Sequence, residues 1–502
     1  MSIIECSDKM RLWGVRDLSS NPDILLVNTP LSDYGEILGK PTVYWPPMGL
    51  AYLGQYVDGK GFEAHVWDAE IDKISPEGVA DGVEKINPRW VGFNTFTSGI
   101  DTLERIVTEI RKRNPGVGIM LGGIHATVEM GDLLSRPAFE GCVVVRNDGE
   151  MKAVALMDDT PFSRIPGIGY IDSKSGRIVV NEENLEWFVD INKPQCQLSR
   201  RFVPYDPVYG IESPDGKNRS FIATSRGCPY HCTFCASSQL AREGVRVRFR
   251  DPRLVVEEII AIYASGQRDI KFNDDLAFRD ERRICELLEP LLEQGYGLAS
   301  GLELRGNGRA NIIARLDDEV LDLMRDVGVR TIGMGAEQGT LKGMRRIKKA
   351  QTPQNVLDSC RRLAERGIKS SFNFMFGLPG QDEVETRAVV ALALETVLIG
   401  RRYGVETQLD GFPLRPYPGT AIYNDLLAKG FSKEEILAST HIEIPKGAPG
   451  YKQVVPNRTF ADVDPEVEMY HRQVFDTLTS LSTRELLSLQ RRDYPLSLCV
   501  GI

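Results

Sequence analysis

The chain has 502 residues, of which 42% are hydrophobic and 26% are charged, a composition typical of a globular protein with two to four domains. Its formal net charge of −9 argues against a nucleic-acid partner, whose phosphates require a basic surface. The N-terminal residues lack the apolar core of a signal peptide, and no run of about 18 apolar residues occurs. We therefore expect a cytoplasmic protein without membrane attachment.

The nine cysteines are divided between one close group of three and scattered single positions. The scattered cysteines lie mostly in apolar runs, which is typical of reduced core residues rather than of a disulfide framework. They are Cys6, Cys142, Cys196, Cys285, Cys360 and Cys499.

Residues 1–150 are predicted to form an open α/β domain. The continuous apolar run 23–28 is typical of a buried parallel strand, and strands and helices alternate after it. This alternation predicts a doubly wound, Rossmann-like sheet whose ligand binds at the carboxyl ends of the strands. Further strands are expected at 63–68, 90–95, 116–122 and 142–145, and helices at 50–57, 78–85 and 103–112.

The expected strand ends of this domain carry small and hydroxylic residues, which allow a large polar ligand to approach the backbone closely. A G-x-G-x-x-G motif does not follow the first strand, so a dinucleotide is not supported. For His125, bracing the adjacent glycine turn and contacting the ligand are equally good interpretations. The candidate contacts are Thr95, Thr97, Ser98, Gly122, Gly123, His125, Gly149 and Glu150.

Residues 151–218 are predicted to be a linker that contains one hairpin. The runs 168–171 and 177–180 have strand character and are separated by a loop that contains Gly176. The rest of the linker shows no sustained periodicity and is assigned no chemistry.

The segment 224–235 holds the close group of cysteines, Cys228, Cys232 and Cys235, in the spacing C-x3-C-x2-C. A short strand-like run, 220–224, leads into it. A structural zinc site needs four ligands, so a zinc site would require a distant fourth one. Three thiolates on a 4Fe–4S cluster would leave one iron open, which suits catalysis better than pure electron transfer.

Residues 219–420 repeat a strand–helix unit. Six strands are expected at 220–224, 270–272, 298–304, 330–334, 370–376 and 407–412, with helices between them that begin at residues such as Asp251 or Thr352 and end at glycines. The repeat predicts a partial (βα)6 barrel with its reactive groups at the carboxyl ends of the strands. Residues 421–502 are predicted to form a helical C-terminal region that packs as a cap.

The cysteine spacing, with Phe234 before the last cysteine, resembles the signature of radical S-adenosylmethionine (SAM) enzymes. The resemblance implies a 4Fe–4S cluster on Cys228, Cys232 and Cys235 whose open iron chelates the amino and carboxylate groups of SAM. It also implies that an electron from a partner such as flavodoxin or ferredoxin cleaves SAM to methionine and a 5′-deoxyadenosyl radical.

Within this resemblance, polar residues at the expected strand ends become candidates for SAM contacts. Asp274 and Asp275 could accept hydrogen bonds from the SAM ammonium, although one of them could instead cap a helix. Arg305 suits the SAM carboxylate, and Arg309 is a competing candidate that could instead lie on the surface. Glu337 lies in a segment similar to the family's Gly-x-Glu-Ser-Gly. Phe234 completes the predicted SAM site.

The strand ends 95–99 and 122–127 resemble those of the cobalamin-binding domain that precedes many radical SAM domains. The resemblance to this combined family extends over about 23–430. It implies cobalamin without a histidine ligand on cobalt, because D-x-H-x-x-G is absent after the first strand. The family's Gly-x-Gly-Glu is replaced by the residues 147–150.

The resemblance implies a cobalamin-dependent radical SAM methyltransferase that acts on an unactivated carbon, or on phosphorus, of a small molecule in natural-product biosynthesis. Two alternatives stay open. The same cofactors could serve a cyclisation, ring contraction or rearrangement without methyl transfer. The first domain could also have the cobalamin fold without binding cobalamin, since its 147–150 end departs from the family's pattern.

Overall fold

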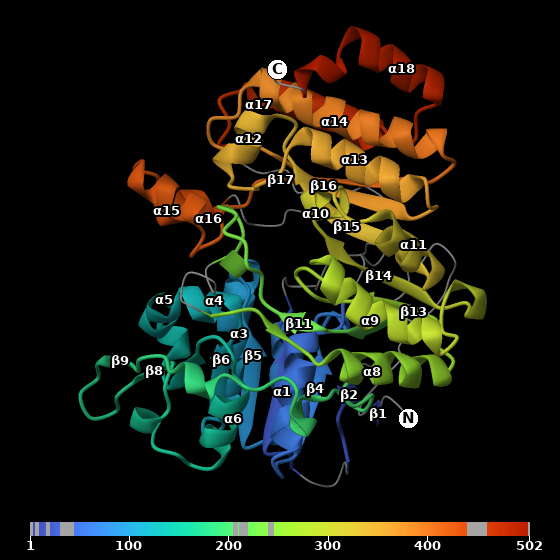
Figure 1. Cartoon of the computed structure of the whole chain (residues 1–502). Coiled ribbons are helices and arrows are strands. Elements are labelled where there is room, and N and C mark those ends of the chain that lie inside the picture. The colour runs from blue at the N-terminus through green and yellow to red at the C-terminus, as the bar shows by residue number, and fades with distance from the viewer. Residues whose placement is uncertain are drawn as a thin grey trace. The chain divides into compact units, whose positions relative to one another are not determined.

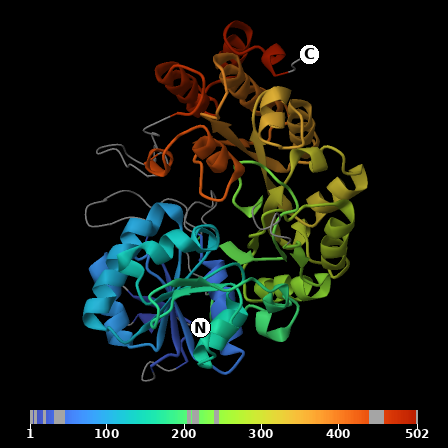
Figure 2. The same cartoon turned by 90° about the vertical axis from the view of Figure 1, so that its left-hand side faces the viewer.

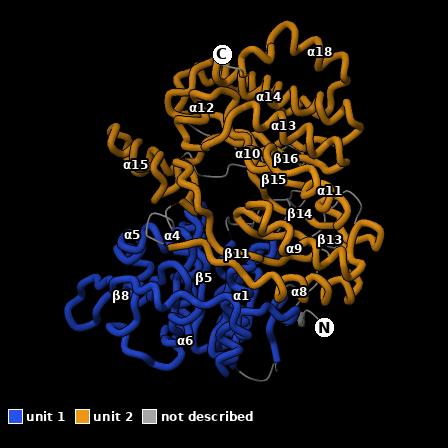
Figure 3. Tube along the Cα trace, in the orientation of Figure 1, with its two compact units in different colours: residues 1–212, 444–453 blue, residues 213–443, 454–502 orange. Residues whose placement is uncertain are grey.

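The computed structural model describes residues 4–5, 10–16, 21–30, 45–203, 209, 219–238, 245–438 and 459–499. The chain divides into two compact units, residues 1–212 with 444–453 and residues 213–443 with 454–502 (Figures 1 and 3). Each unit is built around one large β-sheet. In the part of the chain that the structure describes, no helix is both long and apolar enough to cross a membrane.

The first unit contains a nine-stranded sheet in the order β1-β2-β4-β3-β5-β6-β7-β8-β9. The five central strands of this sheet, β4, β3, β5, β6 and β7, are parallel to one another. Antiparallel strands extend the sheet at both edges. The parallel centre confirms the α/β prediction, whereas the short edge strands β1 and β2 were not predicted. The strands are β1 (Ile4–Glu5), β2 (Arg11–Trp13), β3 (Ile24–Asn28), β4 (Ala64–Asp68), β5 (Trp90–Asn94), β6 (Gly118–Gly122), β7 (Cys142–Val145), β8 (Ile168–Ile171) and β9 (Ile178–Val180).

Helices lie on both faces of this sheet, as a doubly wound fold requires (Figures 1 and 2). Apolar side chains of α2 and α3 pack with those of β3, β5 and β6 into one fully buried core. The helix α1 packs against β3 and β4 instead. The helices are α1 (Met48–Asp58), α2 (Pro76–Ile86), α3 (Ile100–Arg113), α4 (Ile124–Val128), α5 (Met130–Ser135) and α6 (Glu150–Met157).

The predicted hairpin in the 151–218 segment is present as β8 and β9, which pair antiparallel. The strand β8 also pairs antiparallel with β7, so the hairpin continues the first sheet. The hairpin is therefore an edge of the first unit's sheet.

The second unit contains six parallel strands that neighbour one another in chain order. This order is that of the predicted partial barrel, which the structure confirms. A separate two-stranded ribbon pairs β11 (Ser225–Arg226) with β12 (Arg248–Phe249) beside the cysteine loop. The six strands are β10 (Arg219–Ile222), β13 (Asp269–Phe272), β14 (Glu303–Gly308), β15 (Val329–Glu337), β16 (Lys369–Phe376) and β17 (Thr407–Pro413).

Side-chain caps fix where the helices of this unit begin. Asp251, Thr352 and Asp382 each accept a hydrogen bond from a backbone N–H in the first turn of the helix that follows. The helices are α8 (Pro252–Ala264), α9 (Glu281–Glu293), α10 (Ala310–Ile313), α11 (Asp318–Asp326), α12 (Leu341–Arg346), α13 (Pro353–Ala364), α14 (Glu383–Arg402), α15 (Ala421–Ala428), α16 (Lys433–Ala438), α17 (Pro465–Thr477) and α18 (Thr483–Arg492).

The C-terminal helices α17 and α18 pack on α14, which confirms the predicted helical cap (Figure 1). The predicted apolar face of α17 is partly wrong, because Tyr470 is exposed. Its buried residues are Glu468, His471 and Phe475. The two polar residues can be buried because Thr459 donates to Glu468 and because His471 bonds the Tyr494 hydroxyl.

The third barrel strand begins later than predicted. Residues 298–300 form a 3-10 turn closed by Gly301, whose φ of +81° ends any extended run. The strand β14 therefore runs from Glu303 to Gly308. This shift puts Arg305 inside the strand and places Arg309 directly after it.

Candidate active site

The cysteine loop follows β10 and lies entirely within the second unit. Gly227 has a φ of +96°, which turns the chain sharply before Cys228. Cys232 is only 6% exposed, whereas Cys228 and Cys235 are half-buried. The three thiols are free, so all three are available as ligands.

Asp274 fixes the beginning of this loop. Its carboxylate accepts hydrogen bonds from the Thr224 backbone N–H at 2.7 Å and from the hydroxyls of Thr224 and Ser225. The side chain is 2% exposed, and burial raises the pKa of its carboxyl group although these donors oppose the shift. Both oxygens are thus engaged inside the protein, and the contacts tie the end of β13 to the loop that follows β10.

Asp275, the next residue, is exposed and lies close to two of the thiols. Burial raises the pKa of Cys228 and of Cys235, and the negative charge of Asp275 raises both further. The Ser237 hydroxyl, 3.2 Å away, donates to one oxygen of Asp275. The two adjacent aspartates therefore have different environments, one enclosed and one open beside the cysteines.

A second segment, residues 347–351, holds the other side of the loop. The Thr233 backbone N–H donates to the Ile347 carbonyl oxygen at 3.1 Å, and the Cys232 thiol lies 4.0 Å from the Lys348 carbonyl oxygen. On the far side, the Thr233 carbonyl oxygen accepts from the Ile422 N–H of α15. The middle of the loop is therefore fixed by backbone contacts on both sides.

Arg309 reaches the same part of the loop. Its Nη1 lies 3.8 Å from the Cys232 Sγ, and its Nη2 donates to the Lys349 carbonyl oxygen. The guanidinium carbon is 3.7 Å from the centre of the Tyr230 ring, and the residue is 6% exposed. The suggestion that Arg309 could lie on the surface is wrong.

Arg305 does not lie at the carboxyl end of its strand, and that expectation is corrected. Its Nε is 2.9 Å from one oxygen and 3.1 Å from the other oxygen of Asp269, and its Nη1 donates to Thr331. Asp269 is the first residue of β13, and it also accepts from Arg219, the first residue of β10. Arg305 thus belongs to an ion-pair network at the amino ends of the strands.

Glu337 and Phe234 come together near Lys349. Glu337 ends β15 with a φ of +63°, and its carboxylate accepts a 2.8 Å hydrogen bond from Lys349 Nζ. The same Nζ lies 5.8 Å from the centre of the Phe234 ring, which packs on the apolar cluster around Leu378 and Ile422. Sequence reasoning missed Lys349, because it belongs to the basic run 345–349, a pattern that is typical of a solvated helix face.

In the first unit, Thr95 joins the ends of two strands. Its hydroxyl donates to the Gly122 carbonyl oxygen at 2.8 Å and accepts from the Ala126 N–H. A methyl group on Gly123, whose φ is +100°, would lie 3.0 Å from the Thr95 nitrogen. A methyl group on Gly122 would meet no atom within 4 Å, so this strand end is open.

The remaining predicted residues lie around these strand ends. The Thr97 hydroxyl is 2.9 Å from His125 Nδ1, so the buried imidazole braces the turn. Ser98 lies in a 3-10 turn between β5 and α3 and is half-buried. Gly149 and Glu150 begin α6, and the Glu150 side chain is buried.

A polar network at the ends of β3, β4 and β5 was not predicted. Asp68 is 1% exposed and accepts from Asn28 at 2.7 Å and from the Tyr209 hydroxyl at 2.6 Å. Asn94 donates to Asn28 in turn. Burial raises the pKa of Asp68 to about 6 despite these donors. A polar residue at the end of each of these apolar runs was the signal that could have revealed the network.

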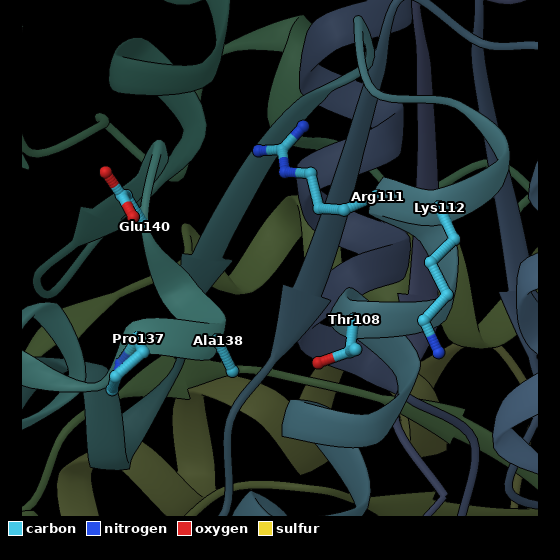
Figure 4. Close-up of a pocket in the computed structure, with 6 residues that line it drawn as sticks. All are labelled: Thr108, Arg111, Lys112, Pro137, Ala138 and Glu140. Atoms are coloured by element: carbon cyan, nitrogen blue, oxygen red, sulfur yellow. The ribbon is translucent and has the colours of Figure 1, made fainter.

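A hollow of about 470 Å³ lies beside the last turns of α3 (Figure 4). The guanidinium of Arg111 at its rim already donates to the carbonyl oxygens of Val117 and Gly141. Since α3 starts after β5 and runs back along the sheet, its last turns lie away from the predicted ligand-binding edge. The hollow is lined by Thr108, Arg111, Lys112, Pro137, Ala138 and Glu140.

The donor sets fit the cofactors that the sequence implies. Among the described residues, no three His, Cys, Asp or Glu side chains converge closely enough to hold a single metal ion. Three free thiols on one partly open loop, with an N–H donor directed at one sulfur, suit an iron–sulfur cluster. The open Gly122–Gly123 end and its neighbouring hydroxyls suit a large polar ligand at the first sheet.

Comparison with known proteins agrees with both assignments. Residues 36–156 match the family model described as B12 binding domain, and residues 222–393 match the Radical SAM superfamily model. The two matched regions fall in the first and second unit, respectively.

Two relatives each align with two thirds or more of this chain. An uncharacterized methyltransferase of Pyrococcus horikoshii is 25% identical over 76% of this chain and 79% of the relative. An anaerobic magnesium-protoporphyrin IX monomethyl ester cyclase of Rubrivivax gelatinosus is 26% identical over 67% of this chain and 60% of its own length.

The fold resembles that of the radical SAM methyltransferase TsrM from Kitasatospora setae, whose structure has cobalamin and a 4Fe–4S cluster bound. The TM-score is 0.58 at 19% identity, with 81% of this chain and 74% of TsrM covered. Because a B12-binding domain precedes a radical SAM domain, the chain belongs to the cobalamin-dependent radical SAM enzymes.

Proposed function

We propose that the protein is a methyltransferase that adds a methyl group to an unactivated carbon, or to phosphorus, of a small molecule. The observation that carries the proposal is the B12-binding domain, since it supplies a methyl carrier in the same chain as a radical-forming domain. A methyltransferase that matches three quarters of the chain supports it. When bound, the cofactors supply a radical that removes a substrate hydrogen and a methyl group that replaces it.

The residues that would hold the cluster are Cys228, Cys232 and Cys235. Asp274 fixes the loop on which they lie, and the 347–351 segment supports its middle. Asp275 would accept hydrogen bonds from the SAM ammonium, because it is the exposed carboxylate beside the thiols. We propose that an electron donor such as flavodoxin or ferredoxin reduces the cluster.

Two further residues stay proposed for SAM. Phe234 packs in an apolar cluster and so anchors the cysteine loop. Glu337 is close to Phe234, because the Lys349 ammonium contacts both the Phe234 ring and the Glu337 carboxylate. Arg305 is not proposed again, because its guanidinium is engaged by Asp269 and Thr331.

The cobalamin contacts are proposed at the carboxyl edge of the first sheet. There Thr95 would hold two strand ends together, and Gly123 would keep the backbone accessible. The bonded pair of Thr97 and His125 would fix the shape of the same edge. The proposed contacts are Thr95, Thr97, Ser98, Gly122, Gly123, His125, Gly149 and Glu150.

The last two barrel strands offer a surface for the substrate. Phe374 and Phe376 of β16 pack on Phe475 of α17, so that face of the sheet is covered. The opposite face carries Asp410 and Phe412, which is 51% exposed. Because a carboxylate and an exposed ring lie side by side, we propose a substrate with both a hydrogen-bond donor and an apolar part.

Product stoichiometry tests the methyl transfer. The anaerobically reconstituted protein is incubated with SAM, a reductant, hydroxocobalamin and small-molecule extracts, and the SAM carries a deuterated methyl group. We expect one 5′-deoxyadenosine and one S-adenosylhomocysteine for each labelled product. Formation of 5′-deoxyadenosine with an unlabelled product and without S-adenosylhomocysteine would contradict methyl transfer.

Cyclisation or rearrangement is the second candidate, because the cyclase of Rubrivivax gelatinosus is 26% identical to the chain where they align, against 25% for the methyltransferase. The unlabelled outcome of the same experiment would support it. The ultraviolet–visible spectrum with and without added hydroxocobalamin separately tests whether the first unit binds cobalamin.

A further inference from the structure

Cys232 differs from the other two cysteines in its surroundings. It is the buried one, and it is the one that the described residues contact through both a guanidinium and a carbonyl oxygen. We propose that Arg309 donates an N–H to the Cys232 sulfur in the loaded enzyme and thereby raises the reduction potential of the cluster. Arg309 is in this sense a positioning and tuning residue.

The Arg309 side chain is held in place by several independent contacts. Its Nη2 bonds the Lys349 carbonyl oxygen, its Nε lies 3.3 Å from the Asn311 side-chain oxygen, and its flat face covers the Tyr230 ring. A guanidinium that is buried and fixed on three sides cannot turn toward water. The remaining Nη1 therefore stays directed at Cys232.

The segment 347–351 has an unusual backbone that places its carbonyl oxygens against the loop. Lys348 and Ala350 have φ values of +52° and +51°, a left-handed conformation that costs a residue with a side chain about 1 kcal/mol or more. Such strain persists only where neighbouring contacts enforce it. Here Lys349 is paired with Glu337, and Gln351 donates to the Gly335 carbonyl oxygen.

Hydrogen bonds to sulfur tune a cluster because reduction adds negative charge to the cluster and its thiolates. A donor directed at a ligand sulfur stabilises the reduced form more than the oxidised form, so the potential rises. Burial of Cys232 strengthens this effect, since water cannot replace the donor. The inference depends on the cluster alone and not on methyl transfer, so it can fail without affecting the proposed function.

A redox titration followed by electron paramagnetic resonance tests the proposal in the full-length reconstituted protein, without substrate. Arg309→Gln should move the midpoint potential to more negative values. At the wild-type midpoint, we expect the ratio of reduced to oxidised cluster to fall roughly tenfold, which corresponds to about 59 mV for one electron.

Arg345→Gln is the matched control. Arg345 lies exposed on α12 of the same unit, so the substitution removes one positive charge without touching the loop. Equal midpoints in R309Q and R345Q, at equal iron content, would overturn the proposal. Arg309→Lys separates charge from geometry, because one ammonium group cannot reproduce the fixed fork of the guanidinium.

If R309Q fails to retain iron, R309K decides the question. A midpoint that lies below the wild-type value, with the charge retained, supports a hydrogen bond to sulfur. A wild-type midpoint in R309K would show that the directed guanidinium N–H does not tune the cluster, and would overturn the proposal.

Discussion

Lys349 Nζ lies 2.8 Å from Glu337 Oε1, and both side chains are about nine-tenths buried. The pair joins the end of β15 to the segment that supports the cysteine loop. A buried ion pair contributes little compared with an apolar pair, but removing one partner leaves an uncompensated charge.

We therefore expect Lys349→Met to destabilise the second unit by about 3 kcal/mol or more, measured by chemical denaturation. The double variant with Glu337→Gln should recover part of the loss, because a neutral amide then replaces the carboxylate that K349M leaves unpaired. Arg345→Met, an exposed change in the same unit, is the control. Equal stabilities of K349M and R345M would contradict the buried-pair interpretation.

The adjacent carboxylates of Asp274 and Asp275 should respond differently to substitution by asparagine. Asp274→Asn replaces one of the two acceptor oxygens with an NH2 group that faces buried hydrogen-bond donors, so we expect a loss of stability of roughly 1–3 kcal/mol and lower iron retention. Asp275→Asn should fold and retain iron.

Equilibrium binding of SAM separates the two roles. We expect D275N to bind SAM at least about tenfold more weakly, since one hydrogen bond to a charged group is lost. Unchanged SAM affinity in D275N with intact iron would remove Asp275 from the proposed site.

Arg305 offers a test of its corrected place. Arg305→Gln leaves the buried Asp269 with Arg219, so we expect a stability loss of about 1–3 kcal/mol. Because the network lies at the amino ends of the strands, the SAM affinity of stably folded R305Q should equal that of the wild type. A SAM affinity reduced tenfold at equal iron content would restore Arg305 as a binding residue.

Much of the architecture could be predicted because the signals are local. The apolar runs at 23–28 and 142–145 and the capping residues Asp251 and Thr352 determine their elements almost alone. The third barrel strand could not be placed in this way. Its start depends on Gly301 adopting a left-handed turn, and the sequence shows only that a glycine is present there.

The sequence identified the cysteines and the strand ends of the candidate site. It did not reveal which polar side chains form hydrogen bonds or ion pairs with one another. Asp274 and Asp275 are identical in type, and only the folded chain brings Thr224 to one of them. Lys349 looked like part of a solvated basic run because its partner Glu337 is twelve residues away on a strand end. Pairing between distant segments is set by the tertiary fold.

The carboxyl group of Asp68 should make the stability of the first unit depend on pH. Its pKa rises from 3.8 to about 6 on folding because it is buried, so the protonated form favours the native state. This contribution is complete below pH 3.8 and is lost as the pH rises through about 6. Two pKa units correspond to about 3 kcal/mol.

Asp68→Asn removes this titration. Between pH 4 and pH 7, we expect the wild type to lose about 2 kcal/mol of stability relative to D68N. All five tryptophans belong to the first unit, so their fluorescence during urea unfolding reports on that unit. Asp158→Asn, an exposed change in the same unit, should follow the wild-type profile. If the pH profiles of D68N and D158N are parallel, Asp68 does not titrate in this range and its carboxylate is charged throughout.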